Sequence, residues 1–253
     1  MIPKIIHYCW FGRGEMPDLV IQCVASWHRH MPNWKYRLWT EASLSQTLSP
    51  LKGEEDSWLE YMPAYVKEAY AAKKYAFVSD YVRLWALERE GGLYMDVDFE
   101  VYKPLDDLMD KYEAFAGYEG SKRNPVMMGV IAAKAHHPWT KGMLQTYNQR
   151  SFINADGSYD MTPNTGYFLN WMQERGFVAD GKEKDFMNVH ILPVECFCPV
   201  LTTGENLRCE RTYSEHKGLH SWSTEGEWKE KVLSVFGEQW KTKLIKLKRI
   251  LLG

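Results

Sequence analysis

The chain has 253 residues, of which 45% are hydrophobic and 25% are charged, the composition of a soluble globular protein with a sizeable core. The net charge of −2 leaves no basic footprint, so nucleic acid is not an expected partner. No stretch approaches the ~20 apolar residues of a membrane span, and five irregularly spaced cysteines indicate reduced thiols and a cytoplasmic chain.

The first elements predicted along the chain are a strand, a helix and a second strand. Residues 3–11 form an apolar run that ends at Gly12, which predicts a buried strand; the run is too short for a signal peptide. A helix is expected over 18–30 and a strand over 36–39. This order is typical of a nucleotide-binding half-fold, in which ligands lie beyond the carboxyl ends of the strands. Trp10 falls at such a strand end.

A helix that ends at Gly91-Gly92 lies at the centre of the chain. A polar segment over 43–60 and a helix over 65–75 precede it. From Tyr75 onward, apolar residues recur at the three- and four-residue spacing of one helical face. The glycine pair ends the helix because glycine adopts the left-handed cap conformation without steric penalty.

After the glycine pair, apolar and polar residues alternate, which predicts a short strand over 93–99 with Asp96 and Asp98 on one face. Aspartate is depleted in strands, and two aspartates this close repel unless a cation lies between them. Mn²⁺ and Mg²⁺ prefer carboxylate oxygen and keep positions open for phosphate. Upstream, Asp80 and Arg83 share a helical face. They either form an ion pair or bind a ribose hydroxyl and a phosphate.

The central stretch resembles the signature of the DXD-containing glycosyltransferases. The motifs are Ser79-Asp80-x-x-Arg83 and Gly91-Gly92-x-Tyr94-x-Asp96-x-Asp98. This family groups yeast initiating mannosyltransferases with bacterial capsular and lipopolysaccharide sugar transferases, and it is related to the catalytic domains of clostridial glucosylating toxins. The resemblance implies an α/β fold of GT-A type, a three-layer α/β/α nucleotide-sugar transferase fold with a mixed central sheet. One catalytic domain over 1–238 is expected, with a nucleotide-binding half over about 1–104 and an acceptor side over about 105–238.

The resemblance also implies roles for individual residues. Trp10 would stack on the nucleotide base, and Asp80 would hold ribose or sugar hydroxyls, with Tyr94 supporting the same pocket. Arg83 would assist at the phosphates. Asp96, Asp98 and a late histidine would hold Mn²⁺ or Mg²⁺. Asp98 would bind the ion directly, and Asp96 would bind it through water or donor hydroxyls.

The second half of the chain alternates strands and helices with loops. Strands are expected over 113–118, 125–133 and 188–194, and helices over 138–150 and 163–175. The polar loop at 119–124 and Asn124 are weaker candidates for contacts with acceptor and donor sugars.

A late segment over 212–222 resembles the family's Tyr-x-x-His followed by Ser-Trp, which supplies the remaining metal ligand and closes over the diphosphate. The family's second adjacent histidine is Lys217 here, and His220 is additional. His216 and His220 therefore both remain candidate ligands, with the register favouring His216. Trp222 is assigned to donor binding.

The composition changes at the end of the chain. Residues 239–253 combine a leucine stripe at helical spacing with interleaved lysines and an arginine. Such a basic amphipathic tail is either a solvated terminal helix or a segment that lies on an anionic membrane. The clustered cations favour peripheral contact with the inner face of the cell membrane.

The resemblance implies a metal-dependent, retaining glycosyltransferase. It would move a hexose from a UDP-sugar, or secondly a GDP-sugar, to a saccharide or lipid-linked saccharide in capsule, lipopolysaccharide or other surface-glycan synthesis. No nucleophile is identified, so front-face attack is the working mechanism. Two alternatives are a metal-dependent nucleotide-sugar phosphohydrolase and a non-catalytic sugar-binding module. The first needs further carboxylates or histidines around paired metals. The second does not need Asp80 and Arg83 beside the two aspartates.

Overall fold

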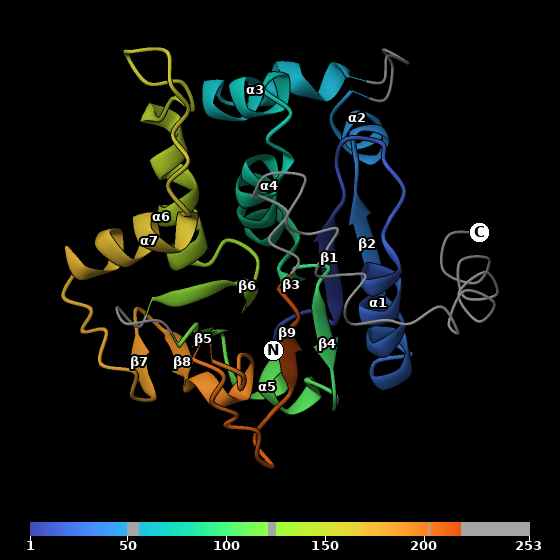
Figure 1. Ribbon diagram of the computed structural model, residues 1–253, viewed down its shortest axis with the longest axis vertical. Helices are drawn as coiled ribbons and strands as arrows, with labels where there is room; N and C mark the ends of the chain where they lie inside the picture. The colour runs from blue at the N-terminus through green and yellow to red at the C-terminus, as the bar shows by residue number, and fades with distance from the viewer. Residues whose placement is uncertain (50–55, 121–124, 202, 219–253) are drawn as a thin grey trace.

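The computed structural model describes residues 1–49, 56–120, 125–201 and 203–218. The strands within these ranges are β1 Ile5–Cys9, β2 Lys35–Trp39, β3 Gly92–Met95, β4 Phe99–Val101, β5 Ala114–Tyr118, β6 Val126–Ala133, β7 Lys184–Phe186, β8 Val189–Leu192 and β9 Ser214–His216. Seven of them form one sheet in the order β2-β1-β3-β6-β5-β8-β7, while β4 and β9 form a separate two-stranded sheet (Figure 1).

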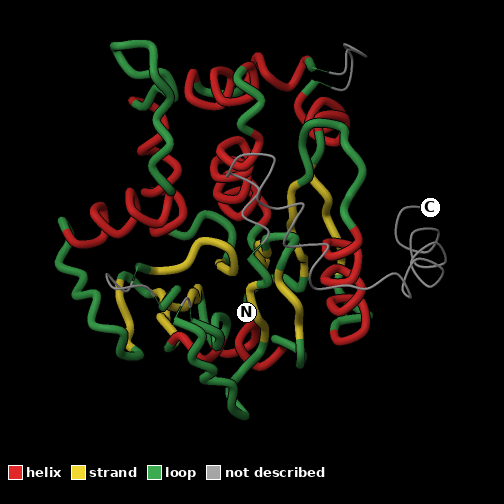
Figure 2. The backbone as a smooth tube through the Cα atoms, viewed as in Figure 1, coloured by secondary structure: helices red, strands yellow, loops and turns green. Residues whose placement is uncertain are grey.

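The helices are arranged around this sheet (Figure 2). The α-helices are α1 Asp18–His30, α2 Glu41–Leu48, α3 Ala64–Ala71, α4 Tyr75–Glu90, α5 Asp106–Lys111, α6 Pro138–Gln145 and α7 Asn164–Gln173. Short 3₁₀ helices are η1 Ser57–Tyr61, η2 Thr146–Gln149 and η3 Val194–Cys196. None of the helices in the described part of the chain is long and apolar enough to cross a membrane.

Both faces of the large sheet are covered by helices. On one face, α4, α6 and α7 contribute Val78, Trp139 and Phe168 to a common core. On the other, α1 and α5 contribute Trp27 and Leu108. The pairs β1–β2, β1–β3 and β5–β8 are parallel, whereas β3–β6, β5–β6 and β7–β8 are antiparallel. This arrangement confirms the three-layer α/β/α fold with a mixed central sheet that the sequence predicts.

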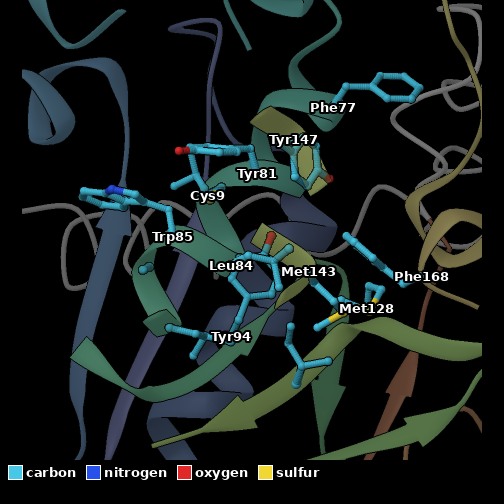
Figure 3. Close-up of a cluster of buried hydrophobic side chains, with 14 of the residues drawn as sticks. Cys9, Phe77, Tyr81, Leu84, Trp85, Tyr94, Met128, Met143, Tyr147 and Phe168 are labelled. Carbon is cyan, nitrogen blue, oxygen red and sulfur yellow. The ribbon is translucent and has the colours of Figure 1, made fainter. Parts of the chain in front are cut away.

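Helix α4 ends where the glycine pair predicts. Gly91 has a φ of +63°, and a Cβ at this position would lie 2.6 Å from the backbone nitrogen of Ala135, so only glycine lets the chain turn here into β3. The apolar face of α4 packs on the sheet and on the neighbouring helices: Figure 3 shows Tyr81 and Leu84 near Tyr94, Met143 and Tyr147. The helix therefore fixes its polar residues rigidly against the sheet.

The prediction of one continuous strand over 93–99 is wrong. The backbone N–H of Asp96 still donates to the carbonyl of Gly129 on β6, at 2.7 Å, and the chain then turns away from the large sheet. The next strand, β4, is held by α1, because Trp27 Nε1 donates to the Phe99 carbonyl at 2.7 Å. As a result Asp96 and Asp98 lie in the turn between β3 and β4 and not on a strand face.

Smaller differences concern short elements. The sequence does not predict β7 and β9, which are three residues long, too short for a period-two pattern to stand out. The helix predicted over 138–150 ends as 3₁₀ helix η2, and α3 ends at Ala71, before the start of α4. His220, Trp222, Asn124 and the tail over 239–253 lie outside the described residues.

Candidate functional site

The candidate site lies at the carboxyl ends of β1 and β3. These two strands are parallel neighbours, with His7 paired to Tyr94, so the residues that follow them come out at the same edge of the sheet. Trp10 follows β1 and Asp96 follows β3. Trp10 is half-buried, and its indole N–H donates to the Gly14 carbonyl at 2.6 Å, which leaves a partly exposed ring at this edge.

A buried arginine joins the carboxylates on one side of the site. Arg83 Nη2 lies 2.8 Å from Asp80 Oδ1 and 3.4 Å from Asp96 Oδ1. The Tyr94 hydroxyl donates to the same oxygen of Asp96 at 2.7 Å, and the Arg83 guanidinium stacks over the Tyr94 ring at 4.7 Å. Four of the residues named from the sequence therefore form one connected cluster.

The remaining donors of Arg83 point into the protein. Nη1 donates to the Met128 carbonyl at 2.7 Å and Nε to the Ser79 carbonyl at 3.4 Å, and the residue is only 5% exposed. Of the two alternatives from the sequence, the described side chains thus adopt the ion pair with Asp80. In this arrangement Arg83 holds two carboxylates in place.

Asp80 is held from two elements. Asn164, the first residue of α7, donates from Nδ2 to Asp80 Oδ1 at 2.8 Å, and Arg83 binds the same oxygen. Burial raises the pKa of Asp80 to about 6, although the guanidinium of Arg83 opposes this shift. The sequence reasoning did not find the role of Asn164. Its place near the start of the helix predicted over 163–175 gives no local signal of a contact with Asp80.

Asp98 belongs to the other side of the site. Its Oδ2 lies 3.0 Å from Nε2 of His216, which comes from β9, and the imidazole stacks on the ring of Phe99 at 4.7 Å between centroids. Although partial burial lowers it, the neighbouring carboxylates of Asp98 and Asp96 raise the pKa of His216 to about 9.

The donor types suit a hard divalent cation only in part. A carboxylate and an imidazole are acceptable ligands for Mn²⁺, with oxygens from phosphate and water completing the shell. Asp98 and His216 provide such a pair, and Asp96 lies two residues away with its Oδ1 bound by Tyr94 and Arg83. Within the part of the chain that the structure describes, no three His, Cys, Asp or Glu side chains are grouped as a complete metal site. Asp98 and His216 are therefore the candidate direct ligands among the described residues, and Asp96 remains a candidate because the contacts with Tyr94 and Arg83 engage only its Oδ1.

Sequence comparison finds a family model and several relatives that match part of this chain. Residues 17–115 match the sequence model described as "Glycosyltransferase sugar-binding region containing DXD motif". Inositol phosphoceramide mannosyltransferase 1 of Schizosaccharomyces pombe is 31% identical over 113 residues, which are 44% of this chain and 32% of the yeast protein. An uncharacterized glycosyltransferase of Acanthamoeba polyphaga mimivirus is 24% identical over 168 residues, 66% of this chain and 62% of the viral protein. The chain thus spans about a third of the length of the first yeast relative.

Two solved structures share parts of the arrangement. A glycosyltransferase involved in glycosylation of the major capsid of PBCV-1 superposes with a TM-score of 0.46 at 13% identity, covering 90% of this chain and 97% of that one. The PaToxG glycosyltransferase gives a TM-score of 0.43 at 20% identity, covering 57% of this chain and 59% of that one.

Proposed function

Because residues 17–115 match the model of glycosyltransferase sugar-binding regions containing a DXD motif, we propose that this chain is a metal-dependent glycosyltransferase. It takes a hexose from a nucleotide sugar, with UDP as the first candidate for the nucleotide and GDP as the second. The observation that carries the proposal is the convergence of Asp80, Arg83, Asp96, Asp98 and His216 at the carboxyl end of β3.

Each side of the site has its own task in this proposal. Asp98 and His216 would hold a divalent ion, Mn²⁺ or Mg²⁺, with Asp96 contributing through water or donor hydroxyls and His220 as the alternative histidine. Such an ion would supply positive charge to offset that of the leaving diphosphate. Trp10 stacks on the base. The oxygen of Asp80 that Arg83 and Asn164 do not bind accepts from a sugar or ribose hydroxyl. Arg83 keeps Asp80 and Asp96 in position.

The acceptor is a saccharide or lipid-linked saccharide, and transfer retains the anomeric configuration. The yeast relative named for inositol phosphoceramide supports a lipid-linked acceptor, and capsule, lipopolysaccharide or another surface glycan is the proposed product. None of the described carboxylates is assigned as a covalent nucleophile, which leaves front-face attack assisted by the departing phosphate as the mechanism.

A screen of nucleotide sugars tests this function. The purified chain is incubated with UDP- and GDP-hexoses and Mn²⁺, and release of nucleotide diphosphate is measured with and without EDTA. We expect slow Mn²⁺-dependent release from one donor, and faster release when a suitable acceptor is added. Release that no saccharide or lipid-linked acceptor accelerates would favour the phosphohydrolase alternative. Absence of UDP and GDP binding in calorimetry with Mn²⁺ would favour a sugar-binding module.

The basic tail over 239–253 provides the proposed membrane contact. Each Lys or Arg near an anionic surface contributes about 1 kcal/mol, and the tail has five: Lys241, Lys243, Lys246, Lys248 and Arg249. We expect the full chain to sediment with anionic vesicles at low salt, and a chain ending at Glu238 to stay in solution. Equal sedimentation of both forms would remove the membrane contact from the proposal.

A further inference from the structure

We propose that Lys217 is a positioning residue that keeps β9, and with it His216, docked on β4 beside Asp98. It does so by clamping two glutamates that lie opposite each other on these strands. The inference rests on the proposed function in so far as His216 is taken as a metal ligand. The clamp itself stands on contacts among described residues.

The two strands bring like charges together. Glu100 on β4 is paired directly with Glu215 on β9, and like charges opposite each other in an antiparallel pair are destabilising. Because successive residues of a strand alternate between its faces, both carboxylates lie on the face opposite His216. Glu215 is 7% exposed, so water screens its charge poorly. This strand pair therefore requires a cation between the two carboxylates.

Lys217 supplies that cation. Its Nζ lies 2.8 Å from Glu100 Oε2 and 3.0 Å from Glu215 Oε1, so one ammonium group bridges both strands. The Tyr102 hydroxyl donates to Glu215 Oε2 at 2.7 Å, and Arg208 Nε donates to the same oxygen at 2.8 Å. Arg208 thus forms an ion pair with Glu215, and the Tyr102 hydroxyl also lies 3.3 Å from Glu100 Oε2. Lys217 differs from both because it brings a positive charge to the two acids at once.

The clamp acts on a short strand. β9 has three residues and pairs with β4. The pairing is extended at its ends by two backbone hydrogen bonds, from Lys217 N to the Asp98 carbonyl and from Tyr102 N to the Tyr213 carbonyl, each 2.8 Å long. If the glutamates repel, these bonds open together. His216 then loses both its stacking on Phe99 and its position 3.0 Å from Asp98.

Hydrogen exchange and Mn²⁺ titration test the clamp. In Lys217→Met, we expect the backbone amides at positions 102 and 217 to exchange at least about tenfold faster, since the two facing carboxylates have lost the cation that they share and Arg208 neutralises Glu215 alone. The Mn²⁺ affinity measured by calorimetry should fall by a similar factor. Lys217→Arg keeps the cation and is expected to behave as the wild type.

A second variant tests the cause. Adding Glu100→Gln to Lys217→Met removes one of the opposed charges and should slow exchange at both amides toward the wild-type rate. Lys134→Met is the matched control: it removes a lysine that pairs with Glu113 at 2.5 Å, away from β9, and should leave both readouts unchanged.

Several results would overturn the inference. These are unchanged exchange in Lys217→Met, a double variant that exchanges as fast as the single one, and faster exchange with unaltered Mn²⁺ affinity. A wild-type chain that binds no Mn²⁺ would refute the metal assignment in the proposed function. In that case the exchange pattern of the variants alone decides whether the clamp exists.

Discussion

Asp96 and Asp98 are two residues apart, yet they belong to two differently built halves of the site. Asp96 faces Arg83 and Tyr94, which come from the long helix α4 and the central strand β3. Asp98 faces His216, which lies 118 residues later in the chain on a three-residue strand outside the large sheet. One half is built from the core of the fold, and the other is docked onto it.

The two aspartates therefore differ in what already binds them. Asp96 Oδ1 accepts a hydrogen bond from the Tyr94 hydroxyl and lies 3.4 Å from Arg83 Nη2, so this carboxylate is fixed before any ligand arrives. Asp98 is paired with an imidazole whose raised pKa marks a place of negative potential. A cation from outside is therefore expected at Asp98, whereas Asp96 shapes the surroundings.

The largest effect is expected from Asp98→Ala. Loss of the carboxylate removes the main candidate metal ligand. Turnover of the nucleotide sugar should fall at least about 10³-fold, because a bound cation contributes several kcal/mol to transition-state stabilisation. Circular dichroism should remain that of the wild type, since Asp98 lies in a turn.

Asp96→Ala sharpens the contrast, because it should lower stability as well as turnover. A variant Asp98→Ala that retains EDTA-sensitive turnover near the wild-type rate would refute this assignment.

A smaller effect, on stability, is expected from Arg83→Met. The substitution leaves Asp80 as a buried carboxylate without its cation, a change that costs about 3–5 kcal/mol in comparable buried pairs. Urea unfolding should show this loss. Arg175→Met, which removes an exposed arginine at the end of α7, serves as the control and should unfold as the wild type does. A midpoint for Arg83→Met within error of the wild type would mean that Arg83 does not hold the core half together.

The core half is the part that sequence reasoning predicted well. The helical spacing of apolar residues predicted both ends of α1 correctly, and the glycine pair predicted the end of α4 at Glu90. These predictions succeed because both helices carry long, regular apolar faces. The spacing of Asp80 and Arg83 on one helical face was sufficient to suggest their ion pair, since neighbours on a helix are fixed by local geometry.

The docked half was predicted only through a resemblance. Alternation over 93–99 continues through Asp96 and Asp98, so the sequence gives no local sign that the chain leaves the sheet there. The break comes from tertiary contacts, such as the hydrogen bond from Trp27 on α1 to the Phe99 carbonyl. The contact of Lys217 with Glu100 joins segments that are far apart in the sequence. Local residue spacing cannot predict such a contact.

The smallest effect concerns the pH dependence of the core half. Because the pKa of Asp80 is raised to about 6 in the folded chain, its contribution to stability is present below the ordinary pKa near 3.8 and is lost as the pH rises through about 6. The difference in unfolding free energy between wild type and Asp80→Asn should therefore fall between pH 4 and 7, by at most about 3 kcal/mol at 1.36 kcal/mol per unit. Urea unfolding at several pH values measures it. A difference for Asp80 that rises with pH would mean that attraction to Arg83 outweighs the effect of burial on this carboxylate.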